Sequence, residues 1–84
     1  MHMHNNHLPL LFVGQGVRTQ LVSVSGSQRT AHRLAELGFV PGVELSVVAD
    51  SGSALMIAVG DTRLALGYPL AQALLVAVLE TEAS

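Results

Sequence analysis

The 84-residue chain contains no cysteine, no tryptophan and no lysine, and only 12% of its residues are charged. Without cysteine it has no disulfide framework, no thiolate zinc site, no iron–sulfur cluster and no cysteine nucleophile. The basic residues are four arginines, too few for the basic stripe by which proteins neutralise nucleic-acid phosphates. We therefore expect no nucleic-acid partner.

Long hydrophobic runs are also absent. Residues 8–13 are too short for the apolar core of a signal peptide, and residues 73–79 fall far below the roughly 20 residues of a membrane-spanning helix. We expect a cytoplasmic protein with no direct membrane insertion. Half of the chain is nevertheless hydrophobic, mostly Leu, Val and Ala, with Phe12, Phe39 and Tyr68 as the only aromatic residues. So much aliphatic surface is difficult to bury completely in one small domain.

Short runs of alternating apolar and polar residues predict a mainly β protein. Five strands are expected. The first covers residues 17–24 and the last residues 74–79, and the three between them carry the buried sets Val43, Leu45 and Val47; Leu55, Ile57 and Val59; and Leu64 and Leu66. Gly60-Asp61 suits a two-residue hairpin turn, and Asp50 to Ser53 form a longer loop. Five short strands in so small a chain most simply curl into a partly open barrel, which reduces exposed edges.

One α-helix is expected between the first and second of these strands. Ser25 or Ser27 is its N-cap, and Leu34 lies on its apolar face. Gly38 ends the helix, because the closing turn requires a left-handed residue, and Phe39 should then contact Leu34. We assign residues 1–7 to a flexible histidine-containing tail, 8–80 to the domain and 81–84 to a flexible C-terminus.

The helix ending, the Pro-Gly turn and the following strand together form a recognisable motif. Its residues are Leu34, Leu37, Gly38, Phe39, Pro41, Gly42, Val43, Leu45 and Val47. This segment resembles the signature of the FeoA family, the small cytoplasmic partner of the bacterial ferrous iron transporter. The similarity continues through residues 63–80 and covers about residues 8–80 in the same order. The resemblance implies an SH3-like barrel with an added helix.

The resemblance also implies a function. It indicates a non-enzymatic accessory protein that docks on the cytoplasmic domain of a FeoB-type ferrous iron transporter and modulates uptake. The last strand has apolar residues on both of its faces, and Val48 and Met56 lie opposite the buried residues of their own strands. These apolar residues mark a candidate protein-binding surface. We predict that its contact residues are Leu75 and Leu79 with Met56 beside them, and secondarily Arg29 and Arg33 on the helix. A surface closing a homodimer, in a self-associating SH3-like module, is the alternative.

Histidines provide a second candidate site. His2, His4 and His7 lie close together, and imidazole is a common ligand of Fe, Zn and Ni, so a small metal-binding protein is a further alternative. No cofactor is required by this interpretation. His32 and Glu36 are spaced to share a helix face, as an ion pair or as two metal ligands. Asp50 and Asp61 both lie in turns and have no accompanying nucleophile, so we expect no catalytic site.

Overall fold

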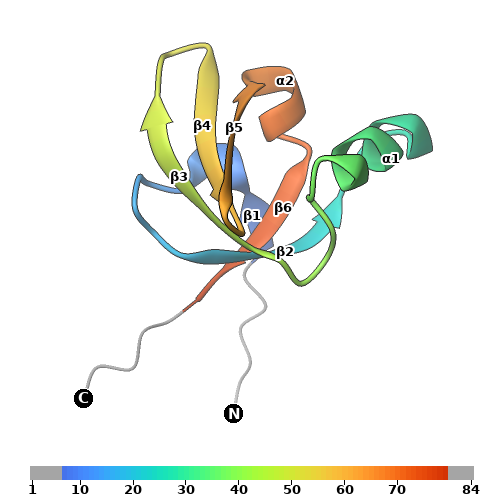
Figure 1. Cartoon of the computed structure of the whole chain (residues 1–84), viewed down its shortest axis with the longest axis horizontal. Helices are drawn as coiled ribbons and strands as arrows, with labels where there is room; N and C mark the ends of the chain where they lie inside the picture. Colours follow the sequence, from blue (N-terminus) through green and yellow to red (C-terminus); the bar gives the residue numbers. More distant parts are fainter. Residues whose placement is uncertain (1–6, 80–84) are drawn as a thin grey trace.

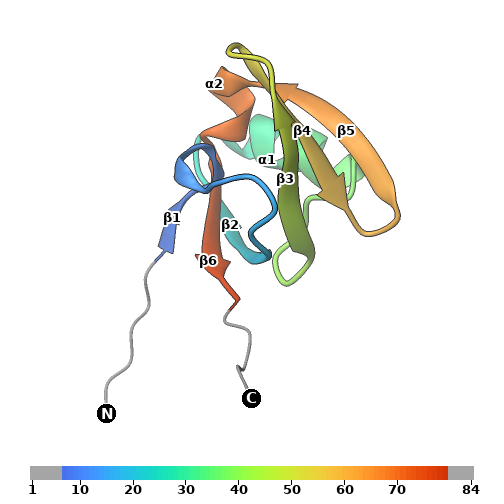
Figure 2. The same cartoon turned by 90° about the vertical axis from the view of Figure 1, so that its left-hand side faces the viewer.

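The computed structural model describes residues 7–79, which form one antiparallel sheet with two helices and a short 3-10 turn (Figure 1). The elements in chain order are β1 (His7–Pro9), η1 (Leu10–Phe12), β2 (Thr19–Val24), α1 (Gln28–Glu36), β3 (Glu44–Asp50), β4 (Ala54–Val59), β5 (Thr62–Gly67), α2 (Tyr68–Ala71) and β6 (Leu74–Val78). The strands are hydrogen-bonded in the order β1-β6-β2-β3-β4-β5. Figure 2 shows the sheet curling around one side, as expected for an SH3-like barrel.

The mainly β prediction is confirmed, and the strand count is corrected from five to six. The additional strand is β1, which pairs with β6 through His7 opposite Ala77 and Pro9 opposite Leu75. Three residues ending in proline give no alternation signal, and proline is tolerated there because β1 is an edge strand. His7, assigned to the tail from the sequence, is therefore the first residue of a strand. The predicted single helix is α1, and α2 adds one further turn before β6.

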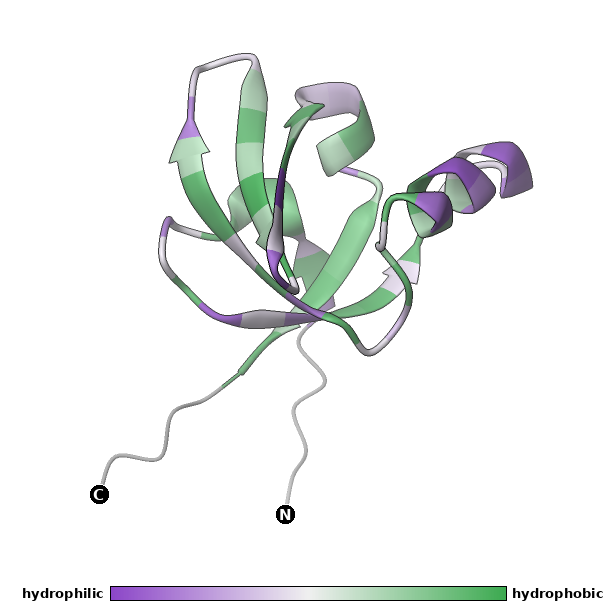
Figure 3. Ribbon diagram, viewed as in Figure 1, coloured by the Kyte–Doolittle hydropathy of each residue, from purple (hydrophilic) through white to green (hydrophobic). Residues whose placement is uncertain are grey.

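The core is aliphatic and lies on the inner face of the curled sheet. The alternation predicted for the strands that the structure shows as β3 and β4 is confirmed. Their buried residues are Leu45, Val47, Leu55, Ile57 and Val59. The remaining buried hydrophobic residues are Leu10, Leu21, Leu34, Phe39, Leu66, Ala71, Leu74 and Val76. Figure 3 shows this division, with apolar strands and a polar outer side of α1.

Two irregularities in the ladder change which side chains face inward. The pairing of β2 with β6 shifts between Leu21 and Ser23, so Thr19 and Leu21 are buried while Val22 is only half-buried. The pairing of β3 with β4 shifts between Val47 and Ala49, which leaves Val48 as the extra residue, 38% exposed. A bulge adds one residue to one strand and so breaks the alternation.

The helix α1 begins and ends where the sequence predicts. The Ser27 hydroxyl accepts a hydrogen bond from the Thr30 N–H at 3.1 Å, which makes Ser27 and not Ser25 the N-cap. At the other end the Phe39 N–H donates to the Leu34 carbonyl, and the Gly38 N–H donates to the Ala35 carbonyl, both at 3.0 Å. These two bonds are the Schellman ending. Only Leu34 of α1 is buried, and Figure 1 shows the helix projecting from the barrel.

Gly38→Ala should destabilise the fold. Gly38 has a φ of 104°, and an added Cβ would meet only Val59 at an ordinary 3.9 Å, so the cost lies in the backbone. We expect the free energy of unfolding to fall by about 1–2 kcal/mol. Urea denaturation measures it, with Gly14→Ala as the matched control. Gly14 has no atom within 4 Å of the added Cβ and no positive φ, so its substitution should be neutral or slightly stabilising. Equal losses in the two variants would contradict this account.

Candidate functional site

The last strand carries apolar side chains on both of its faces. Leu74 and Val76 point into the core and are fully buried, whereas Leu75 and Leu79 on the other side are half-buried. The strand is flanked by β1 and β2 and is also contacted by η1. The N-terminal segment therefore lies against β6, with β1 paired to its edge and η1 in contact with it. Leu75 and Leu79 are only half-buried, so each keeps apolar area that a partner could contact.

Met56 does not lie beside these residues. It is on β4, where it is 37% exposed, and β2 and β3 separate β4 from β6 in the sheet. Both side chains face outward, but neighbouring strands are about 4.8 Å apart, so three strand spacings separate them. The predicted contact residues therefore form two patches, one on β6 and one around Met56. The second patch borders a mostly apolar hollow of about 170 Å³ lined by Ala49, Ser51, Ala54, Leu55, Met56 and Ala65.

Sequence reasoning missed several exposed apolar side chains. Phe12 is 74% exposed at the end of η1. Leu37 and Val40 are 47% and 44% exposed, on either side of the Gly38–Phe39 turn. The exposure of Leu37 and Val40 could have been predicted from the sequence. Once Gly38 reverses the chain and Phe39 points inward, its near neighbours in the turn must point outward.

The arginines fall into two groups. Arg29 and Arg33 are both exposed on α1, one turn apart. Arg18 instead makes a bidentate ion pair, its guanidinium donating to the Glu44 carboxylate at 2.7 and 3.1 Å. The hydrogen bond from Arg18 lowers the pKa of Glu44, and the same bond raises the pKa of Arg18. Arg29 and Arg33 are thus the cations of α1 that face solvent.

The two histidines that the structure describes lie on different elements, His7 on β1 and His32 on α1. His32 and Glu36 share a helix face as predicted, with 3.2 Å between His32 Nε2 and Glu36 Oε2. Within residues 7–79 no group of three metal-ligating side chains is found. His7 is exposed on β1, while His2 and His4 lie outside the described residues. The metal prediction for the three N-terminal histidines therefore stays a prediction.

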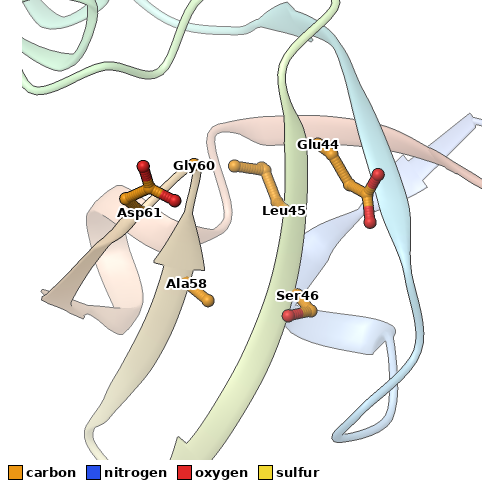
Figure 4. A pocket seen from close by; sticks show the side chains of 6 residues that line it. All are labelled: Glu44, Leu45, Ser46, Ala58, Gly60 and Asp61. Atoms are coloured by element: carbon orange, nitrogen blue, oxygen red, sulfur yellow. The ribbon is translucent and has the colours of Figure 1, made fainter.

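A polar hollow of about 270 Å³ lies where β3 meets the β4–β5 turn (Figure 4). Glu44 and Asp61 are its two acidic residues, and the Glu44 carboxylate is already engaged by Arg18. Asp50 does not reach this hollow. It is paired with Leu55 at the start of β4, whereas Asp61 follows Val59 at the opposite end of that strand. Asp50 and Asp61 thus form no acid–base pair.

Asp50 has a structural contact instead. The Tyr68 hydroxyl donates to Asp50 Oδ1 at 2.5 Å, and the Gly52 N–H donates to the same oxygen at 2.9 Å. The two bonds fasten the β3–β4 loop to the first residue of α2. They lower the pKa of Asp50, with the Tyr68 bond as the larger cause, and the Asp50 carboxylate in turn raises the pKa of Tyr68.

In the part of the chain that the structure describes, exposed apolar side chains dominate the candidate surface, and Asp50 and Asp61 lie at opposite ends of β4. Residues 8–78 match the FeoA domain. The chain belongs to the FeoA family. This family is associated with ferrous iron transport, and its members are generally non-enzymatic accessory proteins. A comparison with curated proteins gives no match. No helix within residues 7–79 is long and apolar enough to cross a membrane.

Solved structures support the family and the fold. An iron uptake regulatory protein, FeoA, is 30% identical with a TM-score of 0.80, over 88% of this chain and 99% of that chain. The Stenotrophomonas maltophilia FeoA in complex with zinc is 34% identical with a TM-score of 0.68, over 77% of this chain and 84% of that one. A manganese-dependent transcriptional repressor reaches a TM-score of 0.82 at 20% identity, over 92% of this chain and 39% of that one. That last likeness shows the fold alone.

Tyr68→Phe should raise the pKa of Asp50 toward its ordinary value, because the largest cause of its lowering is removed. Since the pKa of Asp50 is lower in the folded state, the bond stabilises the fold above the unfolded pKa of about 3.9. That stabilisation disappears as the pH falls through the folded pKa. At alkaline pH it disappears again as the pH rises through the raised pKa of Tyr68.

Carboxyl ¹³C NMR titration measures this change directly. Glu44, whose low pKa depends on Arg18, provides the internal control in the same spectra and should not respond to the loss of the Tyr68 hydroxyl. An Asp50 titration curve that is identical in wild type and Tyr68→Phe would show that the hydrogen bond is not formed in solution.

Proposed function

We propose that the chain is a non-enzymatic accessory protein of bacterial ferrous iron uptake. It acts in the cytoplasm, where it docks on the cytoplasmic domain of the FeoB-type ferrous iron transporter and modulates it. The observation that carries the proposal is the match to the FeoA domain over residues 8–78. The S. maltophilia relative is described as a prokaryotic SH3 domain protein with a suggested role as a ferrous iron transport activating factor.

The surface supports docking better than chemistry. Among residues 7–79 the side chains that stand out are apolar and partly exposed, and the acidic residues of the polar hollow lack a catalytic partner. Aromatic residues line the groove of a peptide-binding SH3 domain. Here Phe39 is buried and Tyr68 half-buried, which leaves Phe12 as the one fully exposed aromatic side chain within residues 7–79, so that mode of binding is disfavoured.

The contact surface that we propose is centred on Leu75 and Leu79 of the last strand and its extension. Both side chains are half-buried. Each therefore has apolar area that a partner can cover, while its buried part is fixed by packing within the domain. Met56 forms a separate contact on β4, and Arg29 and Arg33 provide cationic contacts on α1. Apolar anchors in an interface contribute most of its binding free energy, and charges at its rim contribute mainly to the association rate.

Leu75→Asp should weaken binding to the transporter's cytoplasmic domain. A buried anchor replaced by a charge costs about 2 kcal/mol, which raises the dissociation constant by about thirty-fold. Isothermal titration calorimetry measures this against the purified cytoplasmic domain. The matched control is Val78→Asp, on the same strand, 46% exposed and directed to the other face.

These measurements distinguish a wrong choice of binding face from a failure of the docking function itself. If Leu75→Asp is folded by circular dichroism and binds as wild type does, the assignment of this face is wrong. If the wild-type protein does not bind the domain at all, the docking function itself fails. Restoration of ferrous iron uptake in a strain lacking the gene tests modulation independently of affinity.

Metal binding by the N-terminal histidines is the second candidate function. Two observations favour it: the S. maltophilia relative is a zinc complex, and β1 fixes exposed His7 at the start of the domain. His2 and His4 precede it by a few residues, which allows the three imidazoles to meet at one ion. The ligand would be a divalent transition metal such as Fe, Zn or Ni.

Replacing His2, His4 and His7 together by alanine should abolish zinc binding measured by calorimetry. His32→Ala is the control, because His32 lies on α1 and pairs with Glu36. Protons compete with the metal for the imidazole nitrogens, so zinc affinity should fall as the pH is lowered. Equal zinc affinity in the wild type and the triple variant would rule out the tail site.

A further inference from the structure

The sheet has two edges, and they differ in how they are protected. The β1 edge is three residues long and ends in Pro9, which has no N–H to offer. The β5 edge is six residues long, and its pairing with β4 shows no bulge. Its sequence, Thr-Arg-Leu-Ala-Leu-Gly, contains no proline and no lysine. Natural edge strands prevent pairing with another chain by being short or by carrying a bulge, a proline or a charged side chain. Of these features, β5 has only the charge of Arg63.

The hairpin fixes which backbone groups of β5 point outward. Val59 and Thr62 flank the two-residue turn at Gly60-Asp61 and are therefore a hydrogen-bonded pair. Such pairs alternate with non-bonded ones along an antiparallel ladder, so Leu64 and Leu66 also bond to β4. The N–H and C=O groups of Arg63 and Ala65 then face away from the sheet. Within residues 7–79 no other backbone or side-chain group bonds to them.

We propose that β5 is a self-association edge, where a second copy of this chain adds its own β5 antiparallel, with Ala65 opposite Ala65 of the second copy. Only registers that place odd-numbered residues opposite one another bring outward-facing groups together. Among these, the Ala65–Ala65 register places each Arg63 opposite Gly67 of the second copy. The two arginines are then about 14 Å apart along the strands, beyond the Debye length of about 8 Å.

The other registers bring the like charges closer. A shift that places Arg63 opposite Ala65 of the second copy halves that separation, and the next shift sets the two arginines directly opposite one another, which is destabilising. Charge therefore selects the register. Ala65 at the centre of this register has a small, exposed side chain, and the pairing ends at Gly67, beside Pro69 of α2.

The outer face next to β5 continues the contact. Ala65 is paired with Met56 on β4, and both are exposed beside the apolar hollow of about 170 Å³. In the dimer the apolar strip runs from Met56 through Ala65 to the same residues of the second copy. This gives exposed Met56 a partner that the monomer does not supply. It is separate from the β6 surface proposed for transporter docking.

One strand pair buries less than the about 1,200 Å² of a stable specific interface, so we expect a weak dimer with a dissociation constant of about 0.01–1 mM. Sedimentation equilibrium on the full chain measures it. Ala65→Lys and Ala65→Glu each place two like charges opposite one another and should raise the dissociation constant about five-fold or more. Ala65 is exposed, so either side chain is accommodated without repacking.

A mixture of the two variants separates loss of the interface from misfolding. An equimolar mixture of Ala65→Lys and Ala65→Glu should form a heterodimer at least as tight as the wild-type dimer, which a misfolded variant would not do. The matched control is Arg63→Glu, on the same edge but opposite glycine, which should leave the dissociation constant within about two-fold. Hydrogen exchange should slow at the Ala65 amide as the protein concentration rises.

Three results would overturn the proposal. The first is a protein that stays monomeric up to about 1 mM, the upper end of the affinity expected for so small an interface. The second is a dimer that is equally stable in the wild type, in both single Ala65 variants and in their mixture. The third is a dimer lost in Leu75→Asp but not in Ala65→Lys, which would place the interface on β6.

Discussion

The connection from α1 to β3 is the constraint on which the rest of this small fold depends. The Phe39 N–H closes the helix on the Leu34 carbonyl while its side chain is buried in the core. Three residues later the Gly42 N–H donates to the Leu21 carbonyl, and the Leu21 N–H donates to the Val43 carbonyl, both at 2.8 Å. The same segment therefore ends the helix, fills the core with its one buried aromatic side chain and fixes β3 against β2.

With that connection fixed, α1 needs little packing of its own. Leu34 is its single buried residue; Thr30 and Ala31 are half-buried, and the remaining side chains are exposed. A helix held by its ends can present a full polar face without weakening the core. The apolar residues that the core does not use accumulate elsewhere, on β6, around Met56 and on the Gly38–Phe39 turn. These exposed apolar side chains are the surface on which the proposed docking function depends.

Much of the fold could be predicted because local rules and tertiary packing agree. Gly38 ends the helix for a backbone reason that no neighbour alters, and Gly60 makes the predicted hairpin with a φ of 58°. The alternation through Leu45, Val47 and Ile57 fixes one buried face because a strand has a side-chain period of two. The FeoA signature lies within these same elements, so the family was visible in the sequence as well.

The sequence by itself determined the five strands β2 to β6, the helix α1, the ending of that helix and the family. Each of these depends on residues that lie close together in the chain. Only the tertiary structure decided the pairing of β1, the two bulges, the exposure of Phe12 and the distance between Met56 and β6. These depend on the order of strands in the sheet and on register, which are contacts between residues far apart in the chain. The proposed docking surface depends on such contacts, so the sequence could suggest candidate residues but could not show that Met56 lies apart from β6.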